Sequence, residues 1–371
     1  MVTRSLKFLK GFLIFINLSL IACCLMVYSL PYINSGRYWY FALPGLIFPL
    51  IFFGLVLFIL IWAFAKSKWF WVSFIVLLLG IQQILAVFGF HFPEGFNGTK
   101  SENTLRVLQW NVTNWDQNNE EKKGKESSQL LMLGLVKEQN ADVLCFQEFF
   151  EPLHTKYFQK NIRQIVKLGY PYYYFVSSVT FKHDFKTGVA IFSKYPIIDS
   201  AKFDFGEDSF AEHLIYTDIK IKDKIVRVIT IHLQSVRFGP DDYQSINELK
   251  NRDEAGLKDS RTIVAKLKKG YTYRYSQAEI VRKQIEASPY PVILCGDFND
   301  VPNSNTYFTV KGKLQDAFLK KGFFIGRTFR FISPTLRIDY IFADKKFTIE
   351  QYQRIRVPYS DHYPVEADLA Y

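Results

Sequence analysis

The sequence predicts an α/β protein in which an all-α membrane anchor of three helices precedes a soluble domain built on two β-sheets. Charged residues are almost absent between Gly11 and Phe90, whereas short strand-like and helix-like segments alternate over the rest of the 371 residues. Aromatic residues make up 17% of the chain and there are only four cysteines, which excludes a disordered chain and a disulfide-rich scaffold. The composition is therefore that of a folded protein with an apolar N-terminal part.

Three charged residues, Arg37, Lys66 and Lys68, divide the apolar N-terminal part into three blocks. Each block is close to the ~20 residues that a helix needs to cross ~30 Å of hydrocarbon. None has the polar face of a soluble amphipathic helix. The first block alone is also compatible with a signal peptide, but three in succession favour transmembrane helices. We expect an anchor over residues 1–92 with spans at about 11–33, 41–65 and 69–90.

Positive charges near these spans indicate their orientation. Arg4, Lys7 and Lys10 precede the first span, and Lys66 and Lys68 follow the second. Basic loops stay on the cytoplasmic side, so both groups are expected in the cytoplasm. Three crossings then place the rest of the chain on the outer, periplasmic side of the inner membrane.

A polar segment rich in Gly and Asn, residues 93–103, is expected to be a linker to a catalytic domain over residues 104–371. Apolar runs bounded by turn residues predict strands at Leu105–Trp110, Val143–Phe146, Tyr172–Val176, Gly188–Phe192, Leu214–Ile221, Ile225–Ile231, Val292–Leu294, Ile338–Ile341 and Tyr363–Leu369. Helical periodicity predicts helices over Ser127–Gln139, Thr155–Leu168 and around Ser276–Ile285. The irregular alternation favours a two-sheet α/β layout over a simple parallel sheet.

Polar side chains follow several predicted strands, where α/β proteins commonly build their sites. Asn111 follows the first strand, Glu148 closely follows the second, and His232 follows the sixth. A carboxylate at the end of a strand is a natural ligand for a hard cation. One such residue alone is more often a solvated strand end or a helix cap, and a lone histidine is more often structural. The functional hypothesis therefore depends on the whole set.

The C-terminal half of the chain adds five residues to this set. Asp297 and Asn299 lie in the run Gly-Asp-Phe-Asn after an apolar strand. Side chains two residues apart on an extended chain point the same way, so these two are expected to face one site. Asp339 lies inside an otherwise apolar strand, where a buried carboxylate needs a partner. Asp361 and His362 directly precede the last strand.

This combination of carboxylates, imidazoles and amides indicates a class of chemistry. The sequence has no Gly-x-Ser-x-Gly motif, no phosphate-binding P-loop and no Cys/His zinc spacing. The set suits the hydrolysis of a phosphate ester. In such a reaction Mg²⁺ neutralises the phosphate, one group activates water and another stabilises the departing oxygen.

The order of these motifs resembles the endonuclease/exonuclease/phosphatase superfamily, of the deoxyribonuclease-I-like type. Seven segments carry the resemblance: Trp-Asn-Val, Phe-Gln-Glu, Gly-Val-Ala-Ile-Phe-Ser-Lys-Tyr-Pro-Ile, His-Leu-Gln-Ser, Gly-Asp-Phe-Asn, Arg-Ile-Asp-Tyr-Ile and Ser-Asp-His. They cover about Leu105 to Tyr371. The resemblance implies a four-layer α/β sandwich, with two packed sheets flanked by helices, and a membrane-anchored bacterial member of the family.

The resemblance also implies a role for each site residue. Glu148 would be the principal Mg²⁺ ligand, with Asn111 and Asp361 nearby, and Mn²⁺ is the alternative ion. His362 would act as general base or position the attacking water, and Asp339 would orient it.

The remaining three residues would contact the substrate. Asp297 and Asn299 would align the nucleophile and the phosphate. His232 would bind phosphate or protonate the leaving group.

Some features depart from the family pattern or leave the substrate open. Thr113 stands where some family nucleases have an acidic residue, and no Glu partner for His232 is evident. The segment Val236–Ser288 is rich in Lys, Arg and Tyr, as a lip that holds an anionic substrate would be. The acidic residues mixed into it favour a solvated helical face instead. The net charge of +11 divides into +5 over the first 98 residues and +6 thereafter, so nothing demands nucleic acid.

The sequence therefore predicts a membrane-anchored, divalent-metal-dependent phosphoesterase that hydrolyses a phosphodiester or phosphomonoester by metal-assisted attack of water. The alternatives are a nuclease acting on DNA or RNA outside the cytoplasm, a sphingomyelinase-like lipid phosphodiesterase, and an inactive membrane-anchored binding module. The expected partners are a phosphate-ester substrate and the membrane lipid around the three helices. No obligate protein partner is inferred.

Overall fold

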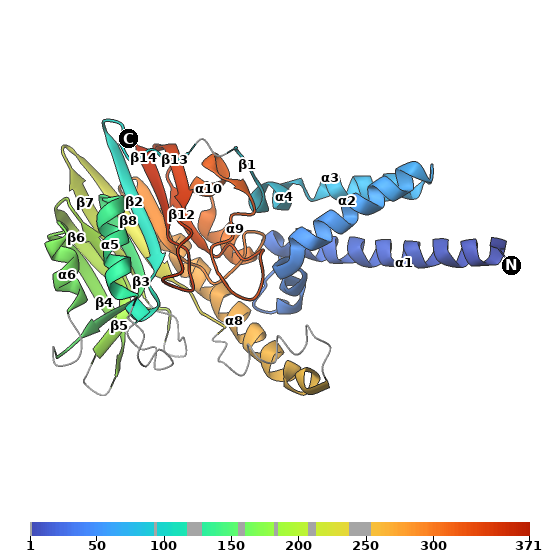
Figure 1. The fold of residues 1–371 in the computed structure, drawn as a ribbon, viewed down its shortest axis with the longest axis horizontal. Coiled ribbons are helices and arrows are strands. Elements are labelled where there is room, and N and C mark those ends of the chain that lie inside the picture. Colours follow the sequence, from blue (N-terminus) through green and yellow to red (C-terminus); the bar gives the residue numbers. More distant parts are fainter. Residues whose placement is uncertain are drawn as a thin grey trace.

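Two six-stranded β-sheets pack face to face in the computed structural model, which describes residues 2–92, 95–116, 128–154, 160–181, 185–206, 213–236 and 254–371 (Figure 1). The strand order is β13-β14-β2-β3-β5-β4 in one sheet and β10-β12-β9-β8-β7-β6 in the other. The strands are β1 (Gly89–Phe90), β2 (Thr104–Asn111), β3 (Val143–Pro152), β4 (Tyr172–Phe181), β5 (Phe185–Ser193), β6 (Ile197–Phe203), β7 (Leu214–Ile221), β8 (Lys224–His232), β9 (Val292–Asp297), β10 (Gln315–Asp316), β11 (Phe323–Phe324), β12 (Asp339–Ala343), β13 (Thr348–Arg354) and β14 (Val365–Ala370).

Helices cover the outer face of each sheet and complete four layers. These helices are α5 (Gln129–Gln139), α6 (Asn161–Lys167), α8 (Glu254–Glu286) and α9 (Asn305–Lys311). The short helix α10 (Ala317–Lys321) lies beside β12 and β13, and its Ala317 belongs to the core between the sheets. Apolar residues of α5 and α6 pack with β2 and β3, and those of α8 and α9 pack with β8, β9 and β12. The predicted four-layer α/β sandwich is therefore confirmed.

Strand β2 shows how the alternation of side chains builds these layers. Val107 belongs to the apolar core between the two sheets, whereas Leu108 and Trp110 belong to the cluster under α5. Gln109 and Asn111 continue the face of Val107 and are buried as well. The inter-sheet layer thus changes from apolar to polar toward the carboxyl end of β2, and the candidate site forms there.

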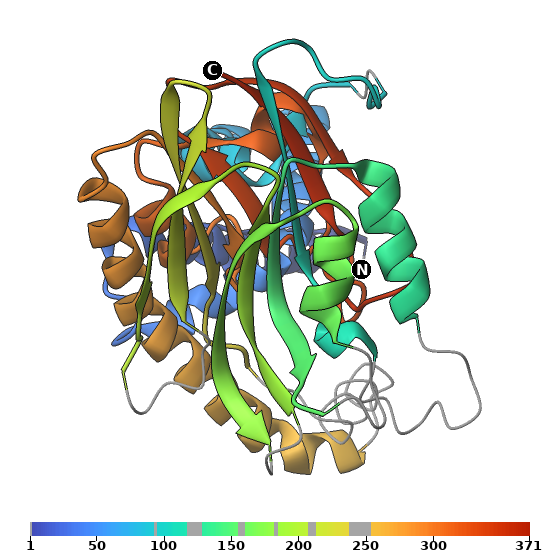
Figure 2. The same ribbon diagram turned by 90° about the vertical axis from the view of Figure 1, so that its left-hand side faces the viewer.

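The apolar N-terminal part forms helices α1 (Val2–Ser29), α2 (Phe48–Phe64), α3 (Trp69–Leu79) and α4 (Ile81–Val87), with 3₁₀ turns η1 (Leu30–Tyr32) and η2 (Trp39–Ile47). Figure 1 shows that they project from one side of the sandwich, and in Figure 2 they lie behind it in blue. Two helices, Ser5–Tyr32 and Trp39–Phe64, are long and apolar enough to cross a membrane.

The third predicted span is not a single straight helix. The chain bends by 60° between α3 and α4, so this pair counts as a span only if both parts are taken together. Gly80 lies at the bend, where an added Cβ atom would lie 2.0 Å from the Tyr28 ring of α1. The absence of a Cβ atom at Gly80 thus permits the close approach of α1 at the bend.

The N-terminal helices also contact the sandwich directly. The Asn303 side-chain amide donates a hydrogen bond to the Gly45 carbonyl at 3.2 Å, and the Arg337 guanidinium donates one to the Ala86 carbonyl at 2.8 Å. In the predicted linker, the backbone N–H of Asn97 donates to the Gln351 side chain at 2.6 Å. The described part of this segment therefore lies along the sandwich.

Two edge strands, β6 and β13, were not predicted from the sequence, whereas the edge strand β4 was. Strands β6 and β13 lie at the edges of their sheets, and both intersperse polar residues among apolar ones. Asp199 and Lys202 of β6 are exposed, whereas most polar residues of β13 are half-buried. Such residues protect an edge from pairing with other chains, but they erase the apolar pattern by which strands are recognised. The predicted helix around Ser276–Ile285 is the end of α8, which has 33 residues. Residues 155–159 of another predicted helix lie outside the described residues.

Candidate active site

Five of the predicted site residues lie at neighbouring strand ends or turns between the two sheets. In the strand register, His232 on β8 is opposite Asp297 on β9, and Asp297 is opposite Asp339 on β12. Asn111 ends β2 beside the parallel strand β3, which carries Glu148. The register of two sheets therefore brings together residues from five distant segments of the chain.

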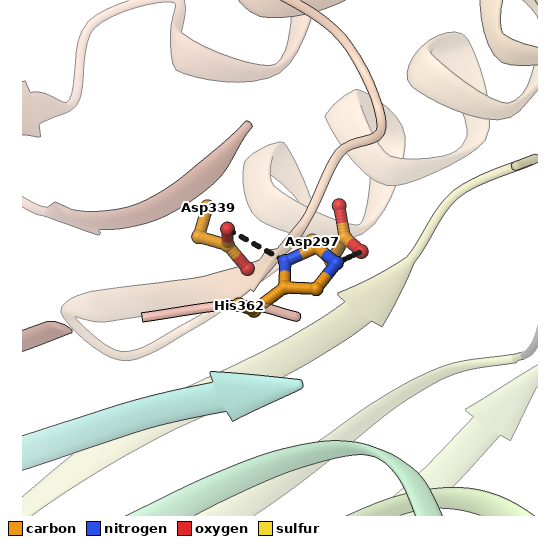
Figure 3. Close-up of side chains that lie close together, drawn as sticks. All are labelled: Asp297, Asp339 and His362. Atoms are coloured by element: carbon orange, nitrogen blue, oxygen red, sulfur yellow. Dashed lines mark hydrogen bonds and ion pairs between the residues drawn. The ribbon is translucent and has the colours of Figure 1, made fainter. Parts of the chain in front are cut away.

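Asp297, Asp339 and His362 form a buried acidic and imidazole cluster (Figure 3). His362 Nδ1 lies 2.9 Å from Asp339 Oδ2, and His362 Nε2 lies 3.6 Å from Asp297 Oδ2. The ring thus lies between two carboxylates. The Trp110 indole donates a hydrogen bond to the His362 carbonyl at 3.0 Å and holds this turn against β2.

Burial and charge oppose each other in this cluster. Burial raises the pKa of Asp297 above its ordinary value, and Asp339 raises it further, against the lowering effect of His362 and His232. Burial lowers the pKa of His362, but the negative charges of Asp339, Asp297 and Asp361 outweigh it and raise this pKa well above 6.5. The carboxylates around His362 therefore favour the charged form of its imidazole, whereas burial favours the neutral form.

Glu148 reaches the site through an irregularity of β3. The pairing with β5 shifts register between Phe146 and Phe149, and Glu148 has φ 49°. Such a bulge turns one side chain out of the alternation of the strand. The Asn111 side-chain amide donates to Glu148 Oε1 and to Asp297 Oδ2, both at 3.1 Å. Asn111 thereby connects Glu148 to the buried cluster.

His232 approaches the same two carboxylates. Its Nε2 atom lies 3.5 Å from Asp297 Oδ2 and 4.0 Å from Glu148 Oε1. A protonated His232 would place positive charge between them. The sequence revealed no acidic partner for His232. In the structure its acidic neighbours are Asp297 and Glu148, two residues of the site itself.

Asn299 and Asp361 are oriented differently from the rest. Asn299 has φ 53°, its N–H donates to Asp297 Oδ1 at 2.8 Å, and its amide donates to the Leu233 carbonyl at 3.0 Å. The expectation of an extended chain at Asn299 is wrong, because β9 ends at Asp297 and a tight turn follows. The Asp361 carboxylate accepts hydrogen bonds from Thr113 and Ser360 and lies outside the three-residue cluster.

A buried polar chain behind the cluster was missed in the sequence. Gln109 Nε2 donates to Asp339 Oδ1 at 3.1 Å and to Gln147 Oε1 at 2.7 Å, and Gln147 Nε2 donates to Thr230 at 2.8 Å. These bonds cross from one sheet to the other and hold Asp339 in place. The available signal was the position of Gln109, two residues before Asn111 and thus on the same face of β2.

The donor set fits a hard divalent cation. Carboxylate and amide oxygens are the ligands that Mg²⁺ prefers, and Glu148, Asn111 and Asp297 present them at adjoining positions. Among the described residues, no Lys or Arg side chain pairs with Asp297 or Asp339. The buried negative charge therefore lacks a fixed cationic side chain to balance it.

The sandwich and its buried acidic and imidazole cluster are features of hydrolases that cleave phosphate esters. Residues 108–362 match the model of the Endonuclease/Exonuclease/phosphatase family, which covers more than half of the chain. The chain belongs to this family, as its motifs predicted. Residues 10–87 match a model described as a domain of unknown function (DUF8431).

Solved structures share the fold at low sequence identity. An endonuclease/exonuclease/phosphatase from Beutenbergia cavernae is 17% identical with a TM-score of 0.51, and the match covers 72% of each chain. The human nocturnin catalytic domain, solved with bound sulfate, is 18% identical with a TM-score of 0.51, and the match covers 73% of this chain and 96% of that one. A comparison with curated protein sequences found no match.

Proposed function

We propose that the protein is a membrane-anchored, divalent-metal-dependent phosphoesterase that hydrolyses a phosphodiester or phosphomonoester by attack of water. The arrangement of His362 between Asp339 and Asp297, linked through Asn111 to Glu148, carries this proposal. It combines a proton-accepting group with adjacent cation ligands, which are the two requirements of metal-assisted hydrolysis.

Each side chain has a proposed part in the reaction. His362 Nε2 takes the proton of the attacking water, while Asp339 at Nδ1 fixes the tautomer and the ring orientation. Asp297 aligns the water next to this nitrogen atom, and Asn299 contacts the phosphate. His232 binds phosphate or protonates the departing oxygen.

The proposed metal ligands are Glu148, with Asn111 and Asp361 nearby. Bound Mg²⁺, or alternatively Mn²⁺, supplies a Lewis acid that neutralises charge on the phosphate ester. Asp297 would also face the ion, because the Asn111 side-chain amide donates hydrogen bonds both to Asp297 Oδ2 and to Glu148 Oε1.

The test is hydrolysis by the full-length protein in detergent or lipid nanodiscs. The substrates are plasmid DNA, RNA, sphingomyelin, inositol phosphates and a generic diester, each with Mg²⁺ and then with EDTA. We expect turnover of at least one ester that EDTA abolishes, and loss of turnover in His362→Ala and Glu148→Gln. His91→Ala, which removes an exposed imidazole on the anchor side, is the matched control.

Metal-independent turnover, or equal turnover in wild type and His362→Ala, would refute the proposal. Turnover of no ester in the panel would instead favour an inactive binding module. The substrate that is cleaved distinguishes a nuclease from a lipid phosphodiesterase, since both remain compatible with the site.

We further propose that the sandwich lies on the outer side of the membrane, because the basic residues flank the cytoplasmic ends of the expected spans. A topology reporter fused after Phe92 should be active only on the outer side. Activity of that reporter in the cytoplasm would reverse the proposed topology.

A further inference from the structure

A groove of about 1070 Å³ separates helix α2 from the edge strand β13 and lies outside the candidate active site. Its walls come from α2, from the segment around β11 and from β13 with the residues that follow it. None of the eight predicted site residues lines it. The groove therefore requires an explanation separate from catalysis.

Part of the groove lining is apolar and includes residues of a helix that is long and apolar enough to span a membrane. Leu50 and Phe53 of α2 are exposed there, as is Phe324 on β11. The rings of Phe53 and Phe324 have centroids 6.2 Å apart, so they form one continuous wall. Both α2 residues lie within the candidate span Trp39–Phe64, so acyl chains of a surrounding bilayer would reach this wall.

Another part of the groove lining is basic. Lys321, Arg327, Arg354 and Arg356 line it, and in the described part of the chain none of them pairs with a carboxylate. The acidic lining residue, Glu350, accepts a hydrogen bond from Thr104 at 3.1 Å.

Crowding of like charge is evident within this basic group. Burial lowers the pKa of Arg354, and the positive charges of Arg356 and Arg327 lower it further. The Arg354 guanidinium donates to the Arg327 carbonyl at 2.6 Å, which brings the two chain segments together. The lining thus presents clustered guanidinium groups that pair with no carboxylate among the residues that the structure describes.

We propose that this groove binds an anionic phospholipid of the surrounding membrane. The headgroup phosphate lies against Arg327 and Arg356, because guanidinium groups bind phosphate oxygens in a planar, two-pronged geometry. An acyl chain lies along Leu50, Phe53 and Phe324, where it replaces water on exposed apolar surface. This inference rests on the proposed membrane anchoring, but it does not depend on the proposed hydrolytic function.

Native mass spectrometry of the full-length protein in detergent tests the proposal, with dioleoylphosphatidylglycerol as the anionic probe and dioleoylphosphatidylcholine as the zwitterionic one. We expect the wild type to retain phosphatidylglycerol preferentially. Arg327→Gln combined with Arg356→Gln should weaken retention roughly tenfold or more, since each basic residue near a membrane surface contributes about 1 kcal/mol. Lys202→Gln combined with Lys220→Gln makes the same charge change on the distant strands β6 and β7 and should have no effect.

Two further variants separate the headgroup and acyl contributions. Arg356→Gln alone changes only an exposed side chain, so it tests the headgroup site even if the double variant fails to fold. Phe324→Asn removes an aromatic ring from the apolar wall and should also weaken retention of phosphatidylglycerol. Phe324 has φ 63°, a backbone conformation that Asn tolerates.

Equal retention of the two lipids by the wild type, or unchanged retention in the arginine variants, would overturn the proposal. Displacement of phosphatidylglycerol by an equal concentration of glycerol phosphate would also overturn it, because the site would then be one for a free phosphate.

Discussion

Single residues at the candidate site adopt conformations that position their side chains at some conformational cost. Glu148 and Asn299 both have positive φ, a region that non-glycine residues rarely occupy. Such conformations persist only where the surrounding contacts outweigh them, and they concentrate at functional sites. Here the contacts are the bond from Asn111 to Glu148 and the bonds that Asn299 makes to Asp297 and Leu233.

Replacement of Asp339 by Asn tests the pair that it forms with His362. The change keeps the shape but removes the carboxylate 2.9 Å from His362 Nδ1, so the ring loses the partner that fixes its tautomer and favours its charged form. We expect turnover of the cleaved ester to fall by about 10²- to 10⁴-fold, the usual contribution of general acid–base catalysis. Steady-state kinetics with saturating Mg²⁺ measure the effect.

The matched control for this prediction is Asp223→Asn, which removes an exposed carboxylate in the turn between β7 and β8. It should retain wild-type turnover. Wild-type turnover in Asp339→Asn would show that Asp339 has no part in orienting His362.

Glu366 predicts a pH dependence of stability. Burial raises the pKa of this carboxyl on β14 from 4.5 to about 7, although Gln353 donates a hydrogen bond to it at 2.6 Å. The folded state then binds the proton more tightly than the unfolded state, so the free energy of unfolding falls as pH rises from about 4.5 to about 7. Above that range the loss is complete.

Glu366→Gln removes this titration while it keeps an acceptor for Gln353. The variant should therefore gain stability relative to wild type as pH rises through that interval, by on the order of 3 kcal/mol at about 1.4 kcal/mol per pKa unit. Urea unfolding at several pH values measures the difference, with Glu102→Gln as an exposed control. Parallel curves for wild type and Glu366→Gln would contradict the assignment.

At the scale of the elements, the site strands β8 and β9 pair so closely that there is no room for a side chain at Gly296. An added Cβ at Gly296 on β9 would lie 2.4 Å from the Ile231 carbonyl oxygen on β8. The glycine therefore permits the close pairing that sets His232 opposite Asp297. The two parallel pairs, β2–β3 and β8–β9, bring their carboxyl ends toward the same region between the sheets.

Arg337 joins three elements just before β12, and its removal should destabilise the fold. Its fully buried guanidinium donates to Asp316 at 2.7 Å and to the Ala86 carbonyl of α4 at 2.8 Å. Asp316 in turn caps the N-terminus of α10. Arg337→Met leaves the Asp316 charge buried without its cation, so we expect a loss of about 3–5 kcal/mol.

Chemical unfolding of the full-length protein in detergent measures this loss. Arg282→Met, which removes a partly exposed guanidinium paired with Glu286 on α8, should change stability far less. Equal effects of the two substitutions would show that the buried network adds no stability beyond a surface pair.

In the whole molecule, the N-terminal helices contribute to the packing of the sandwich. Tyr271 on α8 and Ile325 near β11 belong to the same apolar cluster as residues of α1, α2 and α4. Leu46 packs against a second cluster that includes Phe329 and Ile338, close to the site. The helices thus cover apolar surface of the sandwich beyond any role in the membrane.

A chain reduced to residues 95–371 should therefore be less stable than the full-length protein. Exposure of two or three of these apolar side chains costs about 3 kcal/mol or more. Urea unfolding of both chains in the same detergent, together with binding of a dye specific for apolar surface, tests this. An unchanged midpoint and no dye binding would show that the sandwich is independent of the anchor.

Much of this organisation follows from local features of the sequence. Apolar blocks separated by one or two charged residues indicate membrane helices, because the thickness of the bilayer sets the number of residues in each block. Apolar runs predicted the central strands, and the motif order predicted the family and its four layers. The edge strands β6 and β13 were missed because polar residues are interspersed among their apolar ones, so no apolar run marks either strand.

Contacts between distant segments depend on the tertiary structure. Asn111 and Asp297 are 186 residues apart, and only the register across two sheets brings the amide to 3.1 Å from the carboxylate. The bulge at Glu148, the turn at Asn299 and the bend at Gly80 are likewise seen only in the tertiary structure. Residue types and their order thus indicate the chemistry, whereas strand register and close packing decide which of those groups meet.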